Sequence, residues 1–318
     1  MIIKNFVALS LNPALDITLW VTGLNKEYNY VTNEQHEAAG KAVNVARVLK
    51  AFKCDCKAII LAGSENKVRY FNRLDKDEID YQTVFVNGET RENISVVSPD
   101  GSLIRLARSG FIIDEVSLIE IKKHLANFVN TGTVVVVAGK NPNGLDTPEF
   151  SALCSYIKGL GGELAIDTSS LKEGELCALR PWVIKPNLEE LESMTGETLD
   201  SEGKILKAFA RLHKAGVRHI LLSVGGDGLY YFGAEHEAAP KVLYAAVPQV
   251  KVKSTVGAGD SSLSGFLLAH KSGCDIMECV RVAASFGTAS VMLDGTNPPR
   301  LEELEIIYPQ VNVREIVK

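Results

Sequence analysis

Six short apolar runs recur along the chain, and helical or irregular segments separate them. The runs occupy residues 6–9, 58–62, 134–138, 164–167, 182–185 and 219–224. A strand whose side chains are apolar on both faces has to be covered on both faces, as in a parallel sheet that lies between helices. This pattern therefore favours an α/β fold.

Helical patterns lie between these runs. Four apolar residues from Val45 to Phe52 follow the i, i+3, i+4, i+7 spacing of one buried helix face. Further helices are expected over residues 204–216, and from near Ala258 and near Ile276. Repeated β-α units are joined by right-handed crossovers, so we expect a layered α-β-α domain with a mostly parallel central sheet.

Two segments, at about residues 14–36 and 82–108, interrupt this alternation. Their polarity alternates like that of half-exposed strands, and the Pro-Asp-Gly sequence at 99–101 indicates a turn between two such runs. We expect them to form a small antiparallel sheet that acts as a lid beside the main domain. Residues 1–318 would then form a single domain with this lid, through which a homodimer could also form.

Composition and charge argue against several classes of function. The net charge of -5 does not favour nucleic-acid binding, and the apolar runs are far too short to span a bilayer. The first ten residues lack the basic and long apolar regions of a secretory signal, and the six cysteines lack zinc-site spacing. We therefore expect a cytoplasmic protein with reduced thiols and without a nucleic-acid or membrane partner.

A glycine-rich turn, Gly257-Ala-Gly-Asp260, precedes a helical run. Such a turn directs free backbone N–H groups and the positive end of the helix dipole at one point, which attracts phosphate. An aspartate at this position repels phosphate, but it is suited to take a proton from an attacking hydroxyl. From these four residues alone, an ordinary helix cap is the favoured interpretation.

The longer stretch Ser254-Thr-Val-Gly-Ala-Gly-Asp260 resembles the C-terminal signature of the ribokinase-like carbohydrate kinases, the pfkB family. Its form is similar to the branch of 1-phosphofructokinases and tagatose-6-phosphate kinases. Five further stretches resemble motifs of that branch in the same order: residues 11–16, 39–47, 90–93, 185–190 and 223–228. The resemblance implies a ribokinase-like fold and ATP- and magnesium-dependent phosphoryl transfer to a ketohexose monophosphate.

The resemblance also implies roles for single residues on the catalytic side. Asp260 would be the base that activates the acceptor hydroxyl. The backbone amides of Gly257, Ala258 and Gly259 would form an anion hole for the charge that develops on the transferred group.

On the acceptor side, the resemblance implies that Asp16, Gly40 and Asn44 face the sugar. Lys41 and Arg91 would bind the phosphate that the sugar already carries, since a compact ammonium and a planar guanidinium both suit a phosphate.

On the nucleotide side, the resemblance implies that ATP contacts Lys185 and the set Asn187, Ser223, Gly225, Gly228 and Thr255. Asn187 and Glu190 would also bind a magnesium ion through water. Two alternatives stay open, because a surface helix can carry the same Asn-Glu pair and residues 225–228 can form a simple hairpin turn.

The sequence departs from the branch mainly on the acceptor side. Ala39 and Ala42 replace glycines, Tyr30 replaces an arginine, and Lys140 replaces a serine. Lys140 would then supply compensating positive charge, and the acceptor could be unusual. Two other hypotheses therefore remain: a kinase of an unphosphorylated sugar or nucleoside, and a non-catalytic regulator that binds a sugar phosphate.

Overall fold

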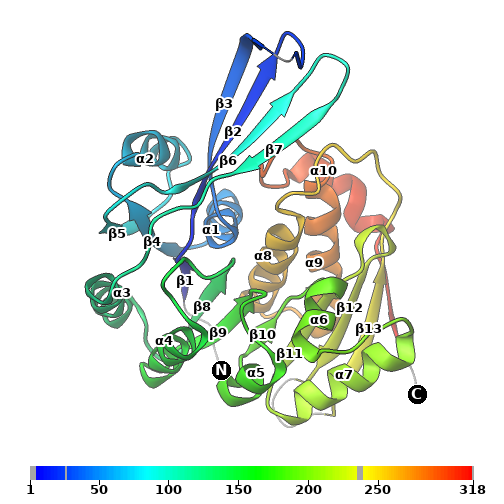
Figure 1. Ribbon diagram of the computed structural model, residues 1–318. Coiled ribbons are helices and arrows are strands. Elements are labelled where there is room, and N and C mark those ends of the chain that lie inside the picture. The colour runs from blue at the N-terminus through cyan, green and yellow to red at the C-terminus, as the bar shows by residue number, and fades with distance from the viewer. Residues whose placement is uncertain (1–4, 26, 235–238, 317–318) are drawn as a thin grey trace.

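The computed structural model describes residues 5–25, 27–234 and 239–316, and within these ranges ten strands form one large sheet (Figure 1). The strand order is β14-β13-β12-β11-β10-β9-β8-β1-β4-β5. All pairs from β5 to β11 are parallel, whereas β11 to β14 pair antiparallel. The bounds are β1 Asn5–Ser10, β4 Cys56–Gly63, β5 Tyr81–Val86, β8 Thr133–Ala138, β9 Glu163–Asp167, β10 Val183–Ile184, β11 His219–Ser223, β12 Leu229–Gly233, β13 Lys241–Ala246 and β14 Asn312–Glu315.

Helices cover both faces of this sheet. Their bounds are α1 Lys41–Ala51, α2 Lys67–Lys76, α3 Glu115–Phe128, α4 Thr147–Gly159, α5 Glu173–Leu179, α6 Leu188–Thr195, α7 Glu202–Lys214, α8 Ala258–Lys271, α9 Ile276–Ser290 and α10 Leu301–Ile307. Two short 3₁₀ turns lie at Gly225–Asp227 and Tyr308–Gln310. The layered α-β-α architecture and the positions of the expected strands and helices are confirmed.

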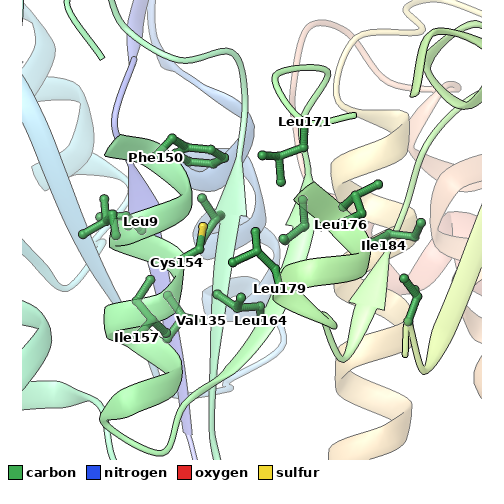
Figure 2. Close-up of a cluster of buried hydrophobic side chains, with 14 of the residues drawn as sticks. Leu9, Val135, Phe150, Cys154, Ile157, Leu164, Leu171, Leu176, Leu179 and Ile184 are labelled. Carbon is green, nitrogen blue, oxygen red and sulfur yellow. The ribbon is translucent and has the colours of Figure 1, made fainter. Parts of the chain in front are cut away.

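Alternate residues of the central strands pack into opposite layers. Val7 and Leu9 of β1 join the cluster formed with α3 to α7, part of which Figure 2 shows. Phe6 lies on the other face, in the cluster with α1, α8, α9 and α10, and Ala8 lies in an adjoining cluster with α1 and α2. Because each central strand is buried on both faces, its sequence reads as a continuous apolar run.

A second sheet of four strands stands beside the domain, in the order β3-β2-β6-β7 (Figure 1). Its strands are β2 Ala14–Val21, β3 Val31–Ala39, β6 Arg91–Val97 and β7 Leu103–Ala107. One residue of the first expected lid segment, residue 26, lies outside the described residues, as do residues 1–4 before the first apolar run.

Two details of the expected lid are wrong. Residues 82–86 belong to β5, which pairs with β4 of the large sheet, so the second lid segment begins with β6 at Arg91. The small sheet is mixed, because β2 and β6 pair in parallel. Alternating polarity marks a half-exposed strand, and an edge strand of the large sheet carries the same pattern as a lid strand.

Within the described ranges, no helix combines the length and the apolar character that crossing a membrane requires. The longest helix bordering the large sheet, α9, has 15 residues and carries Glu278 in its first turn.

Candidate active site

A cavity of about 570 Å³ lies between the carboxyl ends of the parallel strands, the small sheet and the start of α8. Ligand sites of open α/β sheets are found at this edge. The predicted site residues that line it are Asp16, Gly40, Lys41, Asn44, Arg91, Lys185, Asn187, Glu190, Ser223, Gly225, Gly228, Thr255, Gly257, Ala258, Gly259 and Asp260. Segments far apart in the sequence thus converge on one cavity.

Asp260 occupies the first turn of α8, whose N-cap is Gly257 with φ of 80°. The residue is 4% exposed, and its Oδ2 accepts a hydrogen bond of 2.8 Å from Nδ2 of Asn44 on α1. The first amides of a helix have no partner within the helix, so this end of α8 offers backbone donors to an anion beside the carboxylate.

Burial disfavours the charged form of Asp260, and the neighbouring charge of Asp167 adds to this effect. Together they raise the pKa of Asp260 to about 6, against the opposing influence of the hydrogen bond from Asn44 and the ammonium groups of Lys41 and Lys185. A carboxylate with such a pKa is ionised near neutral pH and is still basic enough to accept a proton.

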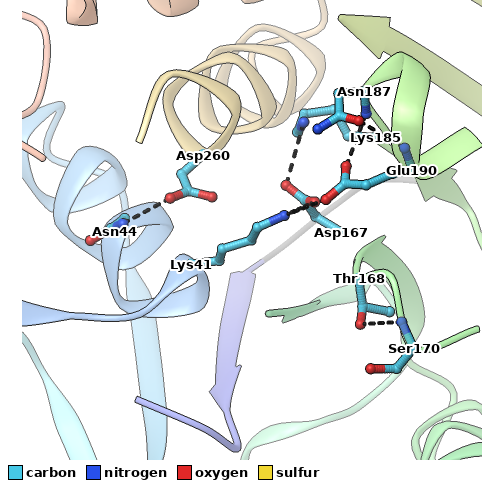
Figure 3. A network of polar contacts seen from close by, with 9 residues as sticks. All are labelled: Lys41, Asn44, Asp167, Thr168, Ser170, Lys185, Asn187, Glu190 and Asp260. Carbon is cyan, nitrogen blue, oxygen red and sulfur yellow. Dashed lines mark hydrogen bonds and ion pairs between the residues drawn. The ribbon is translucent and has the colours of Figure 1, made fainter. Parts of the chain in front are cut away.

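Asp167, the last residue of β9, lies between two lysines (Figure 3). Its Oδ1 is 2.8 Å from Nζ of Lys41, and its Oδ2 is 3.5 Å from Nζ of Lys185. Burial disfavours its charge, but the two ammonium groups outweigh burial and keep the pKa of Asp167 below its ordinary range. Burial disfavours the charge of Lys41, but the carboxylates of Asp167, Glu190 and Asp260 outweigh burial and raise the pKa of Lys41.

Glu190 faces Lys41 from α6, with 3.0 Å between Oε1 and Nζ. Its Oε2 accepts a hydrogen bond of 2.9 Å from the amide of Asn187, and the side chain of Asn187 accepts one of 2.8 Å from the amide of Glu190. The pair is therefore a capping box at the start of α6, and it also lines the cavity. The capping interpretation of this pair is confirmed, and its role in binding magnesium stays a prediction.

Lys185 approaches the backbone of α8 at Gly259. A Cβ at that position would lie 2.8 Å from Nζ and 3.1 Å from Cε of Lys185, so glycine is what allows the ammonium this close. The side chain of Lys185 is 3% exposed. A buried positive charge therefore lies directly at the anion-binding end of the helix.

On the acceptor side, three residues of the small sheet form a chain. Nδ2 of Asn93 donates a hydrogen bond of 2.7 Å to Oδ1 of Asp16, and Nη1 of Arg91 lies 3.4 Å from Oδ1 of Asn93. Burial raises the pKa of Asp16 and lowers that of Arg91. A carboxylate, an amide and a guanidinium group thus lie side by side along β2 and β6.

The replaced glycines do not strain the loop before α1. Gly40, the N-cap of α1, takes the positive φ of 134°, whereas Ala39 ends β3 and Ala42 lies inside the helix. Both alanines are buried, and neither belongs to the described residues with positive φ. Both positions therefore accept alanine without backbone strain, and the side chain of Ala39 lines the cavity.

The nucleotide end of the cavity has polar and apolar parts. Ser223, Gly225 and Gly228 lie where β11 turns into β12, so the hairpin interpretation also holds. The same cavity is lined by apolar side chains from the segment before α8, from α9 and from the residue that follows α9: Val247, Pro248, Val250, Val252, Ala284 and Val291. Such a surface suits the base of a nucleotide.

Residues 10–303 match the family model described as pfkB family carbohydrate kinase. The chain belongs to this family. It is 29% identical over 310 residues to the 1-phosphofructokinase of Borreliella burgdorferi, covering 97% of this chain and 98% of the relative. It is 28% identical over 316 residues to the tagatose-6-phosphate kinase of Staphylococcus epidermidis, covering 98% and 99%.

The crystal structure of phosphofructokinase-2 from Escherichia coli in complex with fructose-6-phosphate has the same fold. It superimposes with a TM-score of 0.85 at 22% identity, over 97% of this chain and 99% of that chain. The expected ribokinase-like fold and the expected activity class, an ATP-dependent carbohydrate kinase, are confirmed for this pfkB kinase.

Lys140 is the exception among the predicted residues. It is exposed, and it does not belong to the described residues that line the cavity. The turn after β8 directs the chain towards α4, so Lys140 lies outside the pocket of this pfkB kinase.

Sequence reasoning missed Asp167, Asn93 and Thr296 as residues that line the cavity. Asp167 had a recognisable feature, because it directly follows an apolar run at the carboxyl end of a parallel strand. Asn93 ends the stretch 90–93, which resembles a motif of the family. Thr296 had no comparable feature, since its position depends on the segment after α9.

Proposed function

We propose that this pfkB kinase transfers the γ-phosphoryl group of ATP to a hydroxyl of a ketohexose monophosphate, with Asp260 as the base. The observation that carries the proposal is the buried carboxylate of Asp260 at the amino end of α8, inside a cavity shared by acceptor-side and nucleotide-side residues. The relatives named 1-phosphofructokinase and tagatose-6-phosphate kinase support this substrate class.

In this proposal the acceptor lies along the small sheet. Asp16 and Asn93 bind sugar hydroxyls, and Arg91 binds the phosphate that the sugar carries. The hydroxyl to be phosphorylated faces Asp260, which takes its proton while the backbone amides of Gly257 to Gly259 bind the developing negative charge. Closing the small sheet over the cavity would keep water away from the γ-phosphate.

Lys41 has a double task in this proposal. With no acceptor bound, its ammonium group neutralises Asp167 and Glu190. Its side chain is 36% exposed, so it can turn towards an acceptor phosphate when one arrives. A neutral acceptor would offer nothing to replace the two carboxylates, which favours a phosphorylated sugar over a free sugar or nucleoside.

Asn187 and Glu190 fit a magnesium ion that is bound through water. Oxygen ligands suit this ion, and Oε1 of Glu190 already holds a cation, the ammonium of Lys41. The described residues contain no cluster of three or more metal-binding side chains, so water and the phosphates of ATP would complete the shell. When bound, magnesium would neutralise charge on the transferred phosphoryl group.

An ADP-release assay tests the proposal with a panel of ketohexose monophosphates, free ketohexoses and nucleosides. Turnover with a phosphorylated sugar, abolished in Asp260→Asn while ATP still binds, is the expected result. Near-normal turnover of Asp260→Asn would rule out Asp260 as the base. Turnover with free sugars or nucleosides would favour the first alternative, and binding of sugar phosphate without ADP release would favour a regulator.

A second variant, at Lys41, tests the proposed site for the phosphate of the acceptor. Lys41→Ala should raise KM for the phosphorylated sugar much more than KM for ATP, because the ammonium group would bind the acceptor. Equal effects on both substrates would argue against this role of Lys41.

We also propose that a second copy of the chain covers the outer part of the small sheet. Val31, Leu103, Ile104 and Leu106 are apolar and exposed there. Sedimentation of the wild type and of Leu106→Lys tests this proposal, with a dimer expected for the first and a monomer for the second. A monomeric wild type at micromolar concentration would contradict it.

A further inference from the structure

Arg47 is a buried cation that lies one helical turn after Asn44 on α1, outside the residues that line the cavity. It is 8% exposed. Its guanidinium group donates hydrogen bonds to four acceptors: Oδ2 of Asp77 at 2.9 Å, Oδ1 of Asn44 at 3.0 Å, Oγ1 of Thr296 at 3.3 Å and the carbonyl of Ala38 at 2.5 Å.

These partners come from different parts of the fold. Asp77 follows α2, Ala38 lies near the end of β3, and Thr296 lies in the segment after α9. A planar guanidinium that is held from several directions has little freedom to move. The bond from Arg47 to Asn44 is therefore fixed in direction.

The amide of Asn44 stands between a group that only donates and a group that only accepts. Arginine has donors alone, and an ionised carboxylate has acceptors alone. Only one orientation of the amide satisfies both neighbours, with Oδ1 towards Arg47 and Nδ2 towards Asp260. Turning the amide would bring Oδ1 against the carboxylate and lose both hydrogen bonds.

We propose that Arg47 is a positioning residue of the phosphoryl-transfer reaction, which fixes the amide of Asn44 so that it donates to the base Asp260 and favours its ionised form. This inference rests on the proposed role of Asp260 as the base. Arg47 acts through Asn44 and contacts neither substrate.

Arg47 would affect the pKa of Asp260 through Asn44, one of several groups that surround this carboxylate. Asp260 is faced by Asp167 from β9, by Lys41 and Asn44 from α1, and by Lys185 from the segment after β10. Burial and Asp167 raise the pKa of Asp260, and the hydrogen bond from Asn44 lowers it. Without Arg47, the amide can offer its oxygen to a protonated carboxyl group, which stabilises the neutral form.

The test compares the pH dependence of kcat in the wild type, Arg47→Met, Asn44→Ala and the double variant. The acid limb should move up by about 0.5 to 1 pH unit in Arg47→Met, as expected for a lost hydrogen bond to a buried carboxylate. In the Asn44→Ala background, Arg47→Met should cause no further shift. Asp77→Asn is the control, because it removes another partner of Arg47 and should lower stability without moving the acid limb.

An unchanged acid limb in Arg47→Met, or an equal additional shift in the Asn44→Ala background, would overturn the inference. If Arg47→Met is too unstable to purify, Arg47→Lys replaces it, since a single ammonium group cannot reach all four acceptors. With Arg47→Lys, an upward shift of the acid limb that disappears in the Asn44→Ala background supports the inference. An acid limb that does not shift in Arg47→Lys overturns it. Asp260→Asn distinguishes a failure of this inference from a failure of the proposed function. An active Asp260→Asn variant would refute Asp260 as the base, whereas an inactive one leaves only the role of Arg47 in question.

Discussion

The ammonium group of Lys41 lies 2.8 Å from Oδ1 of Asp167, and this ion pair joins the start of α1 to the end of β9. Lys185 lies on the other oxygen of the same carboxylate. One buried negative charge therefore holds together two lysines, which come from the start of α1 and from the segment after β10.

Asp167→Asn should destabilise the protein and also alter the base. Breaking a buried ion pair on one side typically costs about 3 kcal/mol, because the remaining charges stay buried without a counter-charge. Removing the carboxylate also removes a repulsion that raises the pKa of Asp260, so the acid limb of kcat should move below its wild-type position. Urea unfolding and pH–rate profiles measure both effects.

Asp200→Asn is the matched control for this prediction. Asp200 pairs with Lys204 at 2.8 Å on the surface, where 60% of its side chain is exposed. Surface pairs of this kind contribute little, so both readouts should stay near wild type. A stable Asp167→Asn variant with an unshifted acid limb would refute the assigned role of the buried pair.

Gly259→Ala should weaken the use of ATP. The new Cβ would stand 2.8 Å from Nζ of Lys185, and this buried side chain would have to move away from the start of α8. We expect kcat/KM for ATP to fall about tenfold, which corresponds to about 1.4 kcal/mol. Steady-state kinetics with varied ATP provide the measurement.

Gly203→Ala serves as the control for helix propensity. Gly203 lies in α7, and apart from its chain neighbours and the nearby backbone of its own helix, no described atom lies within 4 Å of the position its Cβ would take. Activity should be unchanged there. If Gly259→Ala also retains the wild-type kcat/KM for ATP, the close approach of Lys185 to Gly259 does not matter for the use of ATP.

The pH dependence of kcat should have an acid limb with an apparent pKa of about 6. Asp260 accepts a proton only when it is ionised, so activity should fall as the pH drops through that value. A profile with saturating substrates between pH 4.5 and 8.5 measures it. An acid limb near 4 would show that the surroundings do not raise the pKa of the base.

Stability should also depend on pH through Asp260. Its pKa is about 6 in the folded protein and near 3.8 in the unfolded chain, so the folded state holds the extra proton between these values. This contribution to stability is therefore present below about pH 4 and is lost as the pH rises through about 6.

In Asp260→Asn the side chain at this position does not titrate, so the loss of stability at higher pH disappears. Above pH 7 the variant should be more stable than the wild type by up to about 3 kcal/mol, with a smaller gain near pH 4.5. Urea unfolding at both pH values gives the comparison. A gain that is larger at the acidic pH would have the wrong sign and would contradict the prediction.

Much of the fold was predictable because burial on two faces leaves a clear pattern. The run 134–138 could be assigned to a central strand without other information, and β8 spans Thr133–Ala138. The position of β5 was not predictable, because its half-exposed pattern resembles that of a lid strand. Pairing with β4 decides its place, and that pairing depends on residues distant in sequence.

For the site, the sequence by itself determined the parts whose chemistry is local. The turn before Asp260 creates free amides and a helix start wherever it occurs, and residues 187–190 carry their own capping box. The tertiary structure alone decided the environment of Asp260, the proposed base. Asp167, Asn44 and Arg47 act on Asp260 through burial, charge and hydrogen bonds, which depend on distances between segments that only folding brings together.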